Sequence, residues 1–235
     1  MLNLSFGGMR IPSFINITDI TETITPTLSA TKFKTTFGER VITISFKIKR
    51  DMFITKEQKV ELLNFIKGDN FGISKLILPN NTNRYYMAKV TKVSDLSGGR
   101  FFGEGDIEFT CHDYKEYDVN RTLHNSNNGN LTMKYTGTED IYPTVNINVT
   151  GSCNKIKIDF SNSSSSNYLE FNGDFKNGDK IVVNQATSKV TLNNNVNPQI
   201  WHLSSKRNLL INGTNTYRLT SGTATFSIEY NAAYL

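Results

Sequence analysis

Apolar and polar residues alternate without interruption over residues 41–50, and few regular structures are compatible with this pattern. The apolar set is Ile42, Ile44, Phe46 and Ile48, and the polar set between them is Thr43, Ser45, Lys47 and Lys49. Successive side chains of a β-strand point to opposite faces of the sheet, so a period of two places the whole apolar set on one face. We therefore expect a strand at 41–50 with one buried face. Val, Ile, Thr, Tyr and Phe are frequent throughout the chain, which favours sheets elsewhere too.

One segment of the chain has the signals of a helix. Thr55 suits an N-cap, Gln58 completes a capping box three residues later, and Gly68 suits the position after the helix end. We expect a short helix near 56–67 that packs on a sheet. Its apolar stripe is expected to comprise Val60, Leu63 and Ile66, with Leu62 beside them.

Short strands with turn signals between them recur after residue 135. The predicted strands are 143–149, 155–160, 168–171, 180–183, 189–192, 208–211, 214–219 and 223–230. Asn172-Gly173, Asn177-Gly178-Asp179 and Asn212-Gly213 have the composition of hairpin turns. Evenly spaced short strands without a helix are typical of an antiparallel β-sandwich.

These patterns predict a mainly β protein with two domains. Residues 1–125 are expected to form a β-rich domain that bears the helix, with further strands at 73–78, 85–93 and 100–111. The polar, Gly-containing stretch 126–134 is expected to be a linker, and residues 135–235 the sandwich.

Composition narrows the class of function. The net charge of +5 is spread over both halves, whereas nucleic-acid binders concentrate charge on one face. Cys111 and Cys153 lie in separate strand candidates and are expected to be free thiols. We find no signal peptide and no apolar run of membrane-spanning length, so we expect synthesis in the cytoplasm and no membrane partner.

No pattern of an enzyme is present, and we expect no catalytic residues, no cofactor and no metal site. His112, His124 and His202 are scattered, and Asp106, Glu108 and Asp113 near His112 have no recognised ligand spacing. Glu139-Asp140 and Glu170 with Asp174 are the carboxylate pairs that a glycosidase would need, but solvated surface charge is the commoner role. The glycines of 98–105 lack a phosphate-binding spacing and predict a hairpin with a bulge.

Trp201 is the single tryptophan of the chain and has two interpretations. In a sandwich it is more often part of the core, whereas an exposed indole could stack on a sugar. We keep carbohydrate contact by Trp201 as the alternative.

Several segments, taken in order, resemble the distal tail protein family of long, non-contractile-tailed (siphovirus-like) phages and prophages. Leu4–Gly8 with Ile11-Pro12 is similar to its short N-terminal strands, and Phe109–Tyr114 to the end of its first domain, without the Pro found there. The second half is similar more continuously, at 137–143, 145–151, 169–171, 177–183, 190–193, 201–203 and 213–215.

The resemblance implies a virion structural protein at the tail tip. Such proteins form a hexameric ring, a baseplate hub that joins the tail tube to the tail-associated lysin and receptor-binding proteins used in host adsorption. Their first domain builds the ring around a channel through which DNA passes as cargo, and their second is a galectin-like or carbohydrate-module-like sandwich. The alternative function is a carbohydrate-binding adhesion module that contacts a glycan of the host surface. Lys47, Lys49 and Arg50 would then lie on either a solvated surface or a channel wall facing DNA, and we expect the solvated surface.

Overall fold

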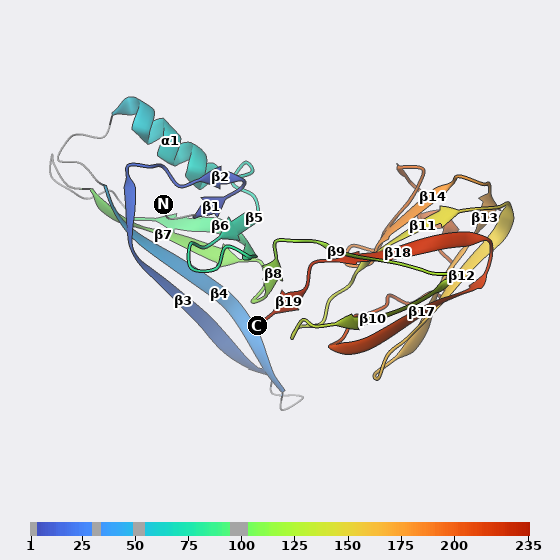
Figure 1. The fold of residues 1–235 in the computed structure, drawn as a ribbon. Helices are drawn as coiled ribbons and strands as arrows, with labels where there is room; N and C mark the ends of the chain where they lie inside the picture. The colour runs from blue at the N-terminus through green and yellow to red at the C-terminus, as the bar shows by residue number, and fades with distance from the viewer. Residues whose placement is uncertain (1–3, 30–33, 49–54, 95–102) are drawn as a thin grey trace. The chain divides into compact units, whose positions relative to one another are not determined.

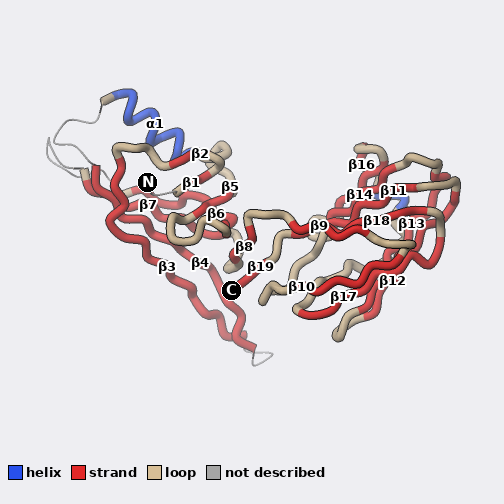
Figure 2. Tube along the Cα trace, in the orientation of Figure 1, coloured by secondary structure: helices blue, strands red, loops and turns tan. Residues whose placement is uncertain are grey.

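The computed structural model describes residues 4–29, 34–48, 55–94 and 103–235 of the chain. Two compact units are present, unit 1 (Met1–Val119) and unit 2 (Asn120–Leu235). Strands dominate both units, and the only α-helix among the described residues lies in unit 1 (Figure 2). The prediction of a mainly β protein with one short helix is confirmed. No helix in the described ranges combines the length and apolar character that crossing a membrane requires.

Unit 1 is built on one antiparallel sheet with the strand order β2-β1-β5-β6-β7-β4-β3. Strand β8 pairs with β6 beside this path. The strands are β1 (Ser5–Phe6), β2 (Met9–Arg10), β3 (Ile15–Ser29), β4 (Lys34–Ile48), β5 (Ser74–Ile77), β6 (Arg84–Val93), β7 (Glu104–Cys111) and β8 (Glu116–Asp118). The long β3–β4 hairpin lies at one end of the sheet (Figure 1).

The alternating segment lies in β4, as predicted. Ile42, Ile44 and Phe46 are buried in the core of unit 1 together with Ile107 and Phe109 of the neighbouring strand β7. Lys47, on the other face, forms an ion pair with Glu104 at 2.6 Å. Lys49 and Arg50 lie outside the described residues.

Helix α1 (Lys56–Lys67) has the predicted N-terminal cap. The Gln58 N–H donates to Thr55 Oγ1 at 3.2 Å, and the Thr55 N–H donates to Gln58 Oε1 at 3.0 Å. The predicted apolar stripe is wrong in part, because Leu62, Phe65 and Ile66 are buried, whereas Val60 and Leu63 are 56% and 61% exposed. The buried three follow an i, i+3, i+4 spacing, which forms one helix face. This face is the buried one because Phe65 packs edge-on against Phe6, with ring centres 6.3 Å apart.

The end of α1 is held by a close approach between Gly68 and the start of the chain. Gly68 has φ +48, and a Cβ at this position would lie 2.5 Å from Cε1 of Phe6. A side chain would therefore be strained by the backbone and would also displace a core aromatic ring. Gly8 has φ +77, but a Cβ there would meet nothing within 4 Å.

We expect Gly68→Ala to destabilise the protein by about 3 kcal/mol and Gly8→Ala by about 1 kcal/mol. Both substitutions incur the strain of a positive φ, and only the first also produces a clash in the core. Urea denaturation of the two variants measures the difference. Equal losses would show that the clash with Phe6 contributes nothing.

A partly buried ionic cluster around the buried Arg40, formed by Glu22, Arg40, Arg84, Tyr86 and Glu116, connects four strands of unit 1. Glu116 of β8 accepts from Arg84 at 2.9 Å, from Tyr86 at 2.8 Å and from Arg40 at 3.3 Å. Glu22 of β3 lies 3.8 Å from Arg40, so two carboxylates balance two guanidinium groups. Burial opposes ionisation of Glu116, but the hydrogen bonds from Arg84 and Tyr86 and the charge of Arg40 outweigh it and lower the pKa of Glu116.

We expect Glu116→Gln to lower the free energy of unfolding by about 3 kcal/mol at neutral pH, because Arg40 is 3% exposed and would lose its closest carboxylate. The folded pKa of Glu116 is lowered, so its contribution is present above the unfolded value of about 4.3 and is lost as the pH falls through the folded pKa. The difference in free energy of unfolding between Glu116→Gln and wild type should therefore become smaller at acidic pH.

The matched control is Glu104→Gln. Its ion pair with Lys47 is solvent-exposed, with 61% and 56% of the two side chains accessible, and should contribute no more than about 1 kcal/mol. Urea denaturation over a range of pH, followed by circular dichroism, compares the variants. A similar loss in both would contradict a special role for the ionic cluster.

Unit 2 consists of two antiparallel sheets, which is the predicted sandwich arrangement. The four-stranded sheet has the order β10-β17-β12-β13, and the six-stranded sheet has the order β16-β15-β14-β11-β18-β9. Alternate residues of β11 and β12 are buried, and Tyr217 and Phe226 meet between the sheets with ring centres 6.4 Å apart. The strands are β9 (Thr122–Asn125), β10 (Asn130–Tyr135), β11 (Thr144–Val149), β12 (Cys153–Ser161), β13 (Ser166–Phe175), β14 (Lys180–Asn184), β15 (Lys189–Leu192), β16 (Asn195–Val196), β17 (Gly213–Ser221), β18 (Ala224–Tyr230) and β19 (Ala233–Tyr234).

The segment expected to be a linker, 126–134, lies within unit 2 instead. Asn127 and Asn130 exchange two backbone hydrogen bonds, and Asn128 and Gly129 between them have φ +49 and +72. This is the geometry of a two-residue hairpin turn, for which an Asn-Gly pair is the preferred sequence. The turn leads directly from β9 into β10, so the polar composition reflects a turn between two strands.

Two further details of unit 2 differ from the predictions. Asn172-Gly173 was expected to be a turn but lies inside β13, where the register against β12 shifts between Cys153 and Lys155, so the extra residues form a bulge. The segment 208–211 was expected to be a strand but makes one bridge, between Leu210 and Ile141. The turn at Gly178, with φ +92, is as predicted.

Both cysteines are free thiols in the structure, as expected. Burial raises the pKa of the Cys111 thiol to about 12, so the thiol remains protonated and unreactive at neutral pH.

Candidate functional site: a hollow lined by Trp201

The segment after β16 covers the outer edge of β13. The His202 N–H donates to the Glu170 carbonyl at 2.9 Å, and the Lys206 N–H donates to the Tyr168 carbonyl at 3.1 Å. The Ser205 hydroxyl accepts from the Glu170 N–H at 2.8 Å and donates to the Glu170 carbonyl at 3.1 Å. These contacts satisfy backbone groups that an edge strand otherwise leaves open, and they fix the course of residues 201–207.

Trp201 follows a short 3₁₀-helix, η1 (Pro198–Ile200), and is half-buried. Its backbone N–H donates to the Pro198 carbonyl at 3.2 Å. Its indole packs against the buried ring of Phe171, with ring centres 6.3 Å apart. Trp201 is therefore neither wholly part of the core nor wholly exposed. Part of it packs on the sandwich, and the rest lines an open hollow.

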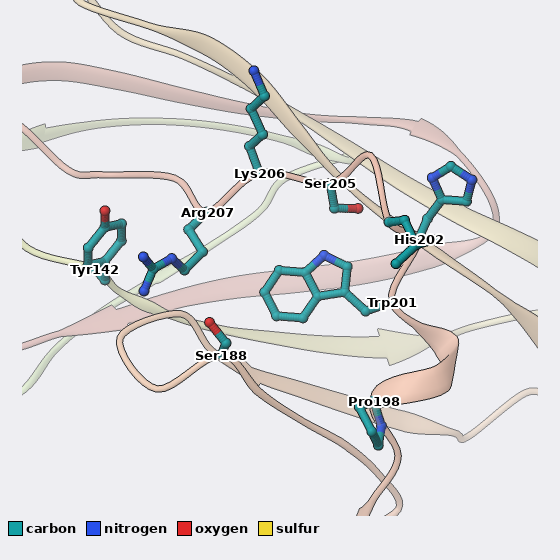
Figure 3. Close-up of a pocket in the computed structure, with 9 residues that line it drawn as sticks. Tyr142, Ser188, Pro198, Trp201, His202, Ser205, Lys206 and Arg207 are labelled. Carbon is teal, nitrogen blue, oxygen red and sulfur yellow. The ribbon is translucent and has the colours of Figure 1, made fainter.

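The hollow has a volume of about 570 Å³. Figure 3 shows the indole at its centre, with Arg207 and Tyr142 to one side and His202 to the other. The lining residues are Tyr142, Ser188, Pro198, Trp201, His202, Leu203, Ser205, Lys206 and Arg207. The volume falls within the range of about 300–1,000 Å³ that is usual for small-molecule sites.

Arg207 is held in place by three neighbouring groups. Its guanidinium carbon lies 4.5 Å from the centre of the Tyr142 ring, a cation–π contact. It also donates to the carbonyls of Gln185 and Ala186 at 3.4 and 3.5 Å, near the upper limit for hydrogen bonds. The next residue, Asn208, is fully buried, and its N–H donates to the side-chain oxygen of Gln185. Gln185 therefore fixes the backbone beside Arg207.

We expect Gln185→Ala to destabilise unit 2 by about 2 kcal/mol, because the buried N–H of Asn208 would lose its acceptor. The loosened segment should also shift the fluorescence of Trp201. Thr187→Ala, in the same turn but exposed, is the control and should change stability by less than about 0.5 kcal/mol. Unfolding by urea, followed by Trp201 fluorescence, measures both, and an unchanged Gln185→Ala variant would contradict the assignment.

Sequence reasoning identified Trp201 and missed Tyr142, Ser188 and Arg207. The chain supplies these three from separate connections, and no motif links them. Ser188 has an unusual backbone conformation that marks it in the structure. It has φ +57 in the turn before β15, an uncommon conformation for a residue with a side chain.

The histidines do not form a catalytic or metal-binding group in the described structure. His124 lies in β9 and stacks on Tyr230, with its Nε2 3.2 Å from the Tyr230 hydroxyl. His202 lines the hollow, and its Nδ1 accepts from the Ser204 N–H at 3.3 Å. Asp113, beside His112, accepts from the Tyr117 hydroxyl. Within the described ranges, no three His, Cys, Asp or Glu side chains gather as metal ligands would.

Two residues of the carboxylate pairs considered for a glycosidase, Glu139 and Glu170, have structural contacts. Glu170 pairs with Lys155 at 3.0 Å, and this hydrogen bond lowers the pKa of the Glu170 carboxyl. Glu139 pairs with Ala233 through its backbone, and the Tyr135 hydroxyl donates to the Glu139 carbonyl at 2.6 Å. Of the Gly98–Gly105 stretch, residues 98–102 lie outside the described residues.

Known proteins that are similar to this chain in sequence or fold come from phage tails. Residues 136–234 match the family model of the siphovirus-type tail component, C-terminal domain. No curated protein sequence matches the chain. The solved Dit (gp 19.1) protein of phage SPP1, described as a paradigm of the hub adsorption apparatus in phages infecting Gram-positive hosts, is similar with a TM-score of 0.69 at 13% identity. The likeness covers 97% of this chain and 98% of that chain.

Chains of the phage P2 baseplate in its activated conformation are also similar. The calcium form has a TM-score of 0.51 and the strontium form 0.52, both at 11% identity and covering 95% of this chain and 92% of that chain.

The fold is therefore a two-unit, mainly β fold shared with proteins of phage tails. Residues 136–234 match the siphovirus-type tail component, C-terminal domain, and together with the likeness to the SPP1 Dit protein this bears out the predicted resemblance to the distal tail protein family. For the remainder of the chain, the likeness to the SPP1 and P2 proteins shows a shared fold.

Proposed function

We propose that the chain is a virion structural protein, a tail-tip hub whose copies form a hexameric ring. The ring joins the tail tube to the tail-associated lysin and receptor-binding proteins of the adsorption apparatus. The observation that carries this proposal is the likeness to a hub protein over nearly the full length of both chains. A structural role without catalysis is supported by the same matches to structural parts of phage tails. The protein's place is then the tail tip of the virion.

Unit 1 offers surfaces suited to contact with a second copy. Val60 and Leu63 lie on the outer face of α1, and Phe71, in the turn after it, is 66% exposed. Phe71 also has φ +61, which is strained for an aromatic residue. Large apolar side chains held outward in this way are typical of protein–protein contacts. Strand β3 ends the sheet and presents an open edge of 15 residues.

A ring requires head-to-tail contacts, in which one surface of a copy meets a different surface of the next. We propose that the outer face of α1, which bears Val60 and Leu63, is one of these two surfaces. Light scattering of the purified protein should then give six times the chain mass of 26.5 kDa above a threshold concentration.

Leu63→Glu should move the equilibrium to the monomer, because burial of the new carboxylate in the contact is unfavourable. Asn64→Glu adds the same charge to an exposed position of the same helix and is the control, which should still assemble. A hexamer with the Leu63→Glu variant would exclude this face from the ring. A wild-type monomer at every concentration would contradict self-assembly of the isolated protein.

DNA passes the ring as cargo in this proposal. The described basic residue of the β4 polar face, Lys47, is neutralised by Glu104 and favours a solvated surface over a wall that holds phosphates. A shift assay at physiological salt should show no tight binding of DNA. Retention of DNA at such salt would point to a nucleoprotein role instead.

The second candidate function is contact with a glycan of the host surface by unit 2. The observation that favours it is the half-exposed Trp201 in a hollow of about 570 Å³. An aromatic plate of this kind suits the apolar face of a sugar ring. Both functions are compatible in one tail protein, since they use different units.

A further inference from the structure

The hollow beside Trp201 carries positive charge without a compensating acid. Lys206 and Arg207 line it, with His202 as a third ionisable base, and no Asp or Glu is among its lining residues. In the part of the chain that the structure describes, neither Lys206 nor Arg207 forms an ion pair. The nearby carboxylate of Glu170 is engaged by Lys155. Open basic groups in a concave site favour an anionic ligand.

Arg207 is the better placed of the two cations for a specific contact. Its guanidinium lies against Tyr142 at 4.5 Å, on the same side of the hollow as Ser188, whereas Lys206 extends outward (Figure 3). A planar guanidinium that is already oriented forms paired hydrogen bonds with a phosphate or a carboxylate and loses little freedom on binding. Lys206 contributes long-range attraction.

The other half of the hollow suits a sugar ring. Trp201 presents an indole supported from behind by Phe171, and Ser188 adds a hydroxyl that can donate or accept. An extended peptide would bind most readily by adding a strand to a sheet edge. That route is closed here, because residues 202–206 already occupy the edge of β13.

We propose that this hollow binds an anionic saccharide unit. The sugar ring stacks on Trp201, and the phosphate or carboxylate of the sugar pairs with Arg207. The inference rests on glycan contact, the second candidate function above, and specifies its ligand. It is independent of the ring formed by unit 1.

The chain contains one tryptophan, so its fluorescence reports on this site alone. The full-length protein is titrated with glucuronate and galacturonate, with the glycosyl phosphates of glucose and galactose, with neutral glucose and galactose, and with inorganic phosphate. The charged sugars should change the fluorescence in a saturable way and bind roughly tenfold more tightly than the neutral ones. Raising the salt concentration should weaken the charged sugars only.

Arg207→Ala should remove the preference for charged sugars, and Arg207→Lys should restore it in part. Lys189→Ala removes the same charge from an exposed position of β15 outside the hollow and should leave binding unchanged. Urea unfolding of each variant shows that unit 2 remains folded.

Each other outcome overturns the proposal in a different way. Equal affinity for neutral and charged sugars would leave glycan contact standing and remove the anionic preference. An equal fluorescence change with inorganic phosphate would reduce the hollow to a simple anion site. Absence of any response to sugars would remove glycan contact as well. None of these results alters the mass measured by light scattering, which tests the ring.

Discussion

The need to satisfy the open edge of β13 determines much of unit 2. An edge strand exposes a row of backbone N–H and C=O groups, and each one left buried without a partner costs about 1–3 kcal/mol. Residues 202–206 meet this need at Tyr168 and Glu170, partly through backbone groups and partly through the Ser205 hydroxyl. The same segment carries Trp201 and Arg207. The candidate site is thus a by-product of closing a sheet, and its shape is as stable as the sandwich beneath it.

The two units handle charge in opposite ways. In unit 1, Glu116 and Glu22 balance the buried Arg40 and the partly buried Arg84, so these charges are used for structure. In unit 2, the basic groups of the hollow have no acidic partner on its lining. Paired buried charges specify which strands are neighbours, whereas open charges remain available to a ligand.

Local signals in the sequence predicted local structure well. The period-two pattern of 42–46 and the Thr55–Gln58 capping box depend only on residues close in the chain, and the structure has both. The buried face of α1 could not be predicted in the same way, because Phe6 selects it from outside the helix. The prediction of a linker at 126–134 was wrong for a different reason, since a linker and an Asn-Gly turn share the same composition. The hollow depended on Trp201 meeting Tyr142 and Arg207, which only the folded sheets bring together.

The position of Phe6 has a consequence for the order in which unit 1 is made. Phe6 is buried, pairs with Leu76 of β5, and packs on Phe109 of β7 with ring centres 5.0 Å apart. Leu76 and Phe109 are therefore translated about seventy and one hundred residues after Phe6, which at usual ribosome speeds takes roughly 4–20 s. In the later part of that interval the β3–β4 hairpin has been translated, but the edge of β4 that pairs with β7 still has no partner strand. A nascent chain in this state is prone to associate with neighbouring chains on the same messenger RNA. Chaperones that bind unfolded chains therefore have a defined interval in which to act.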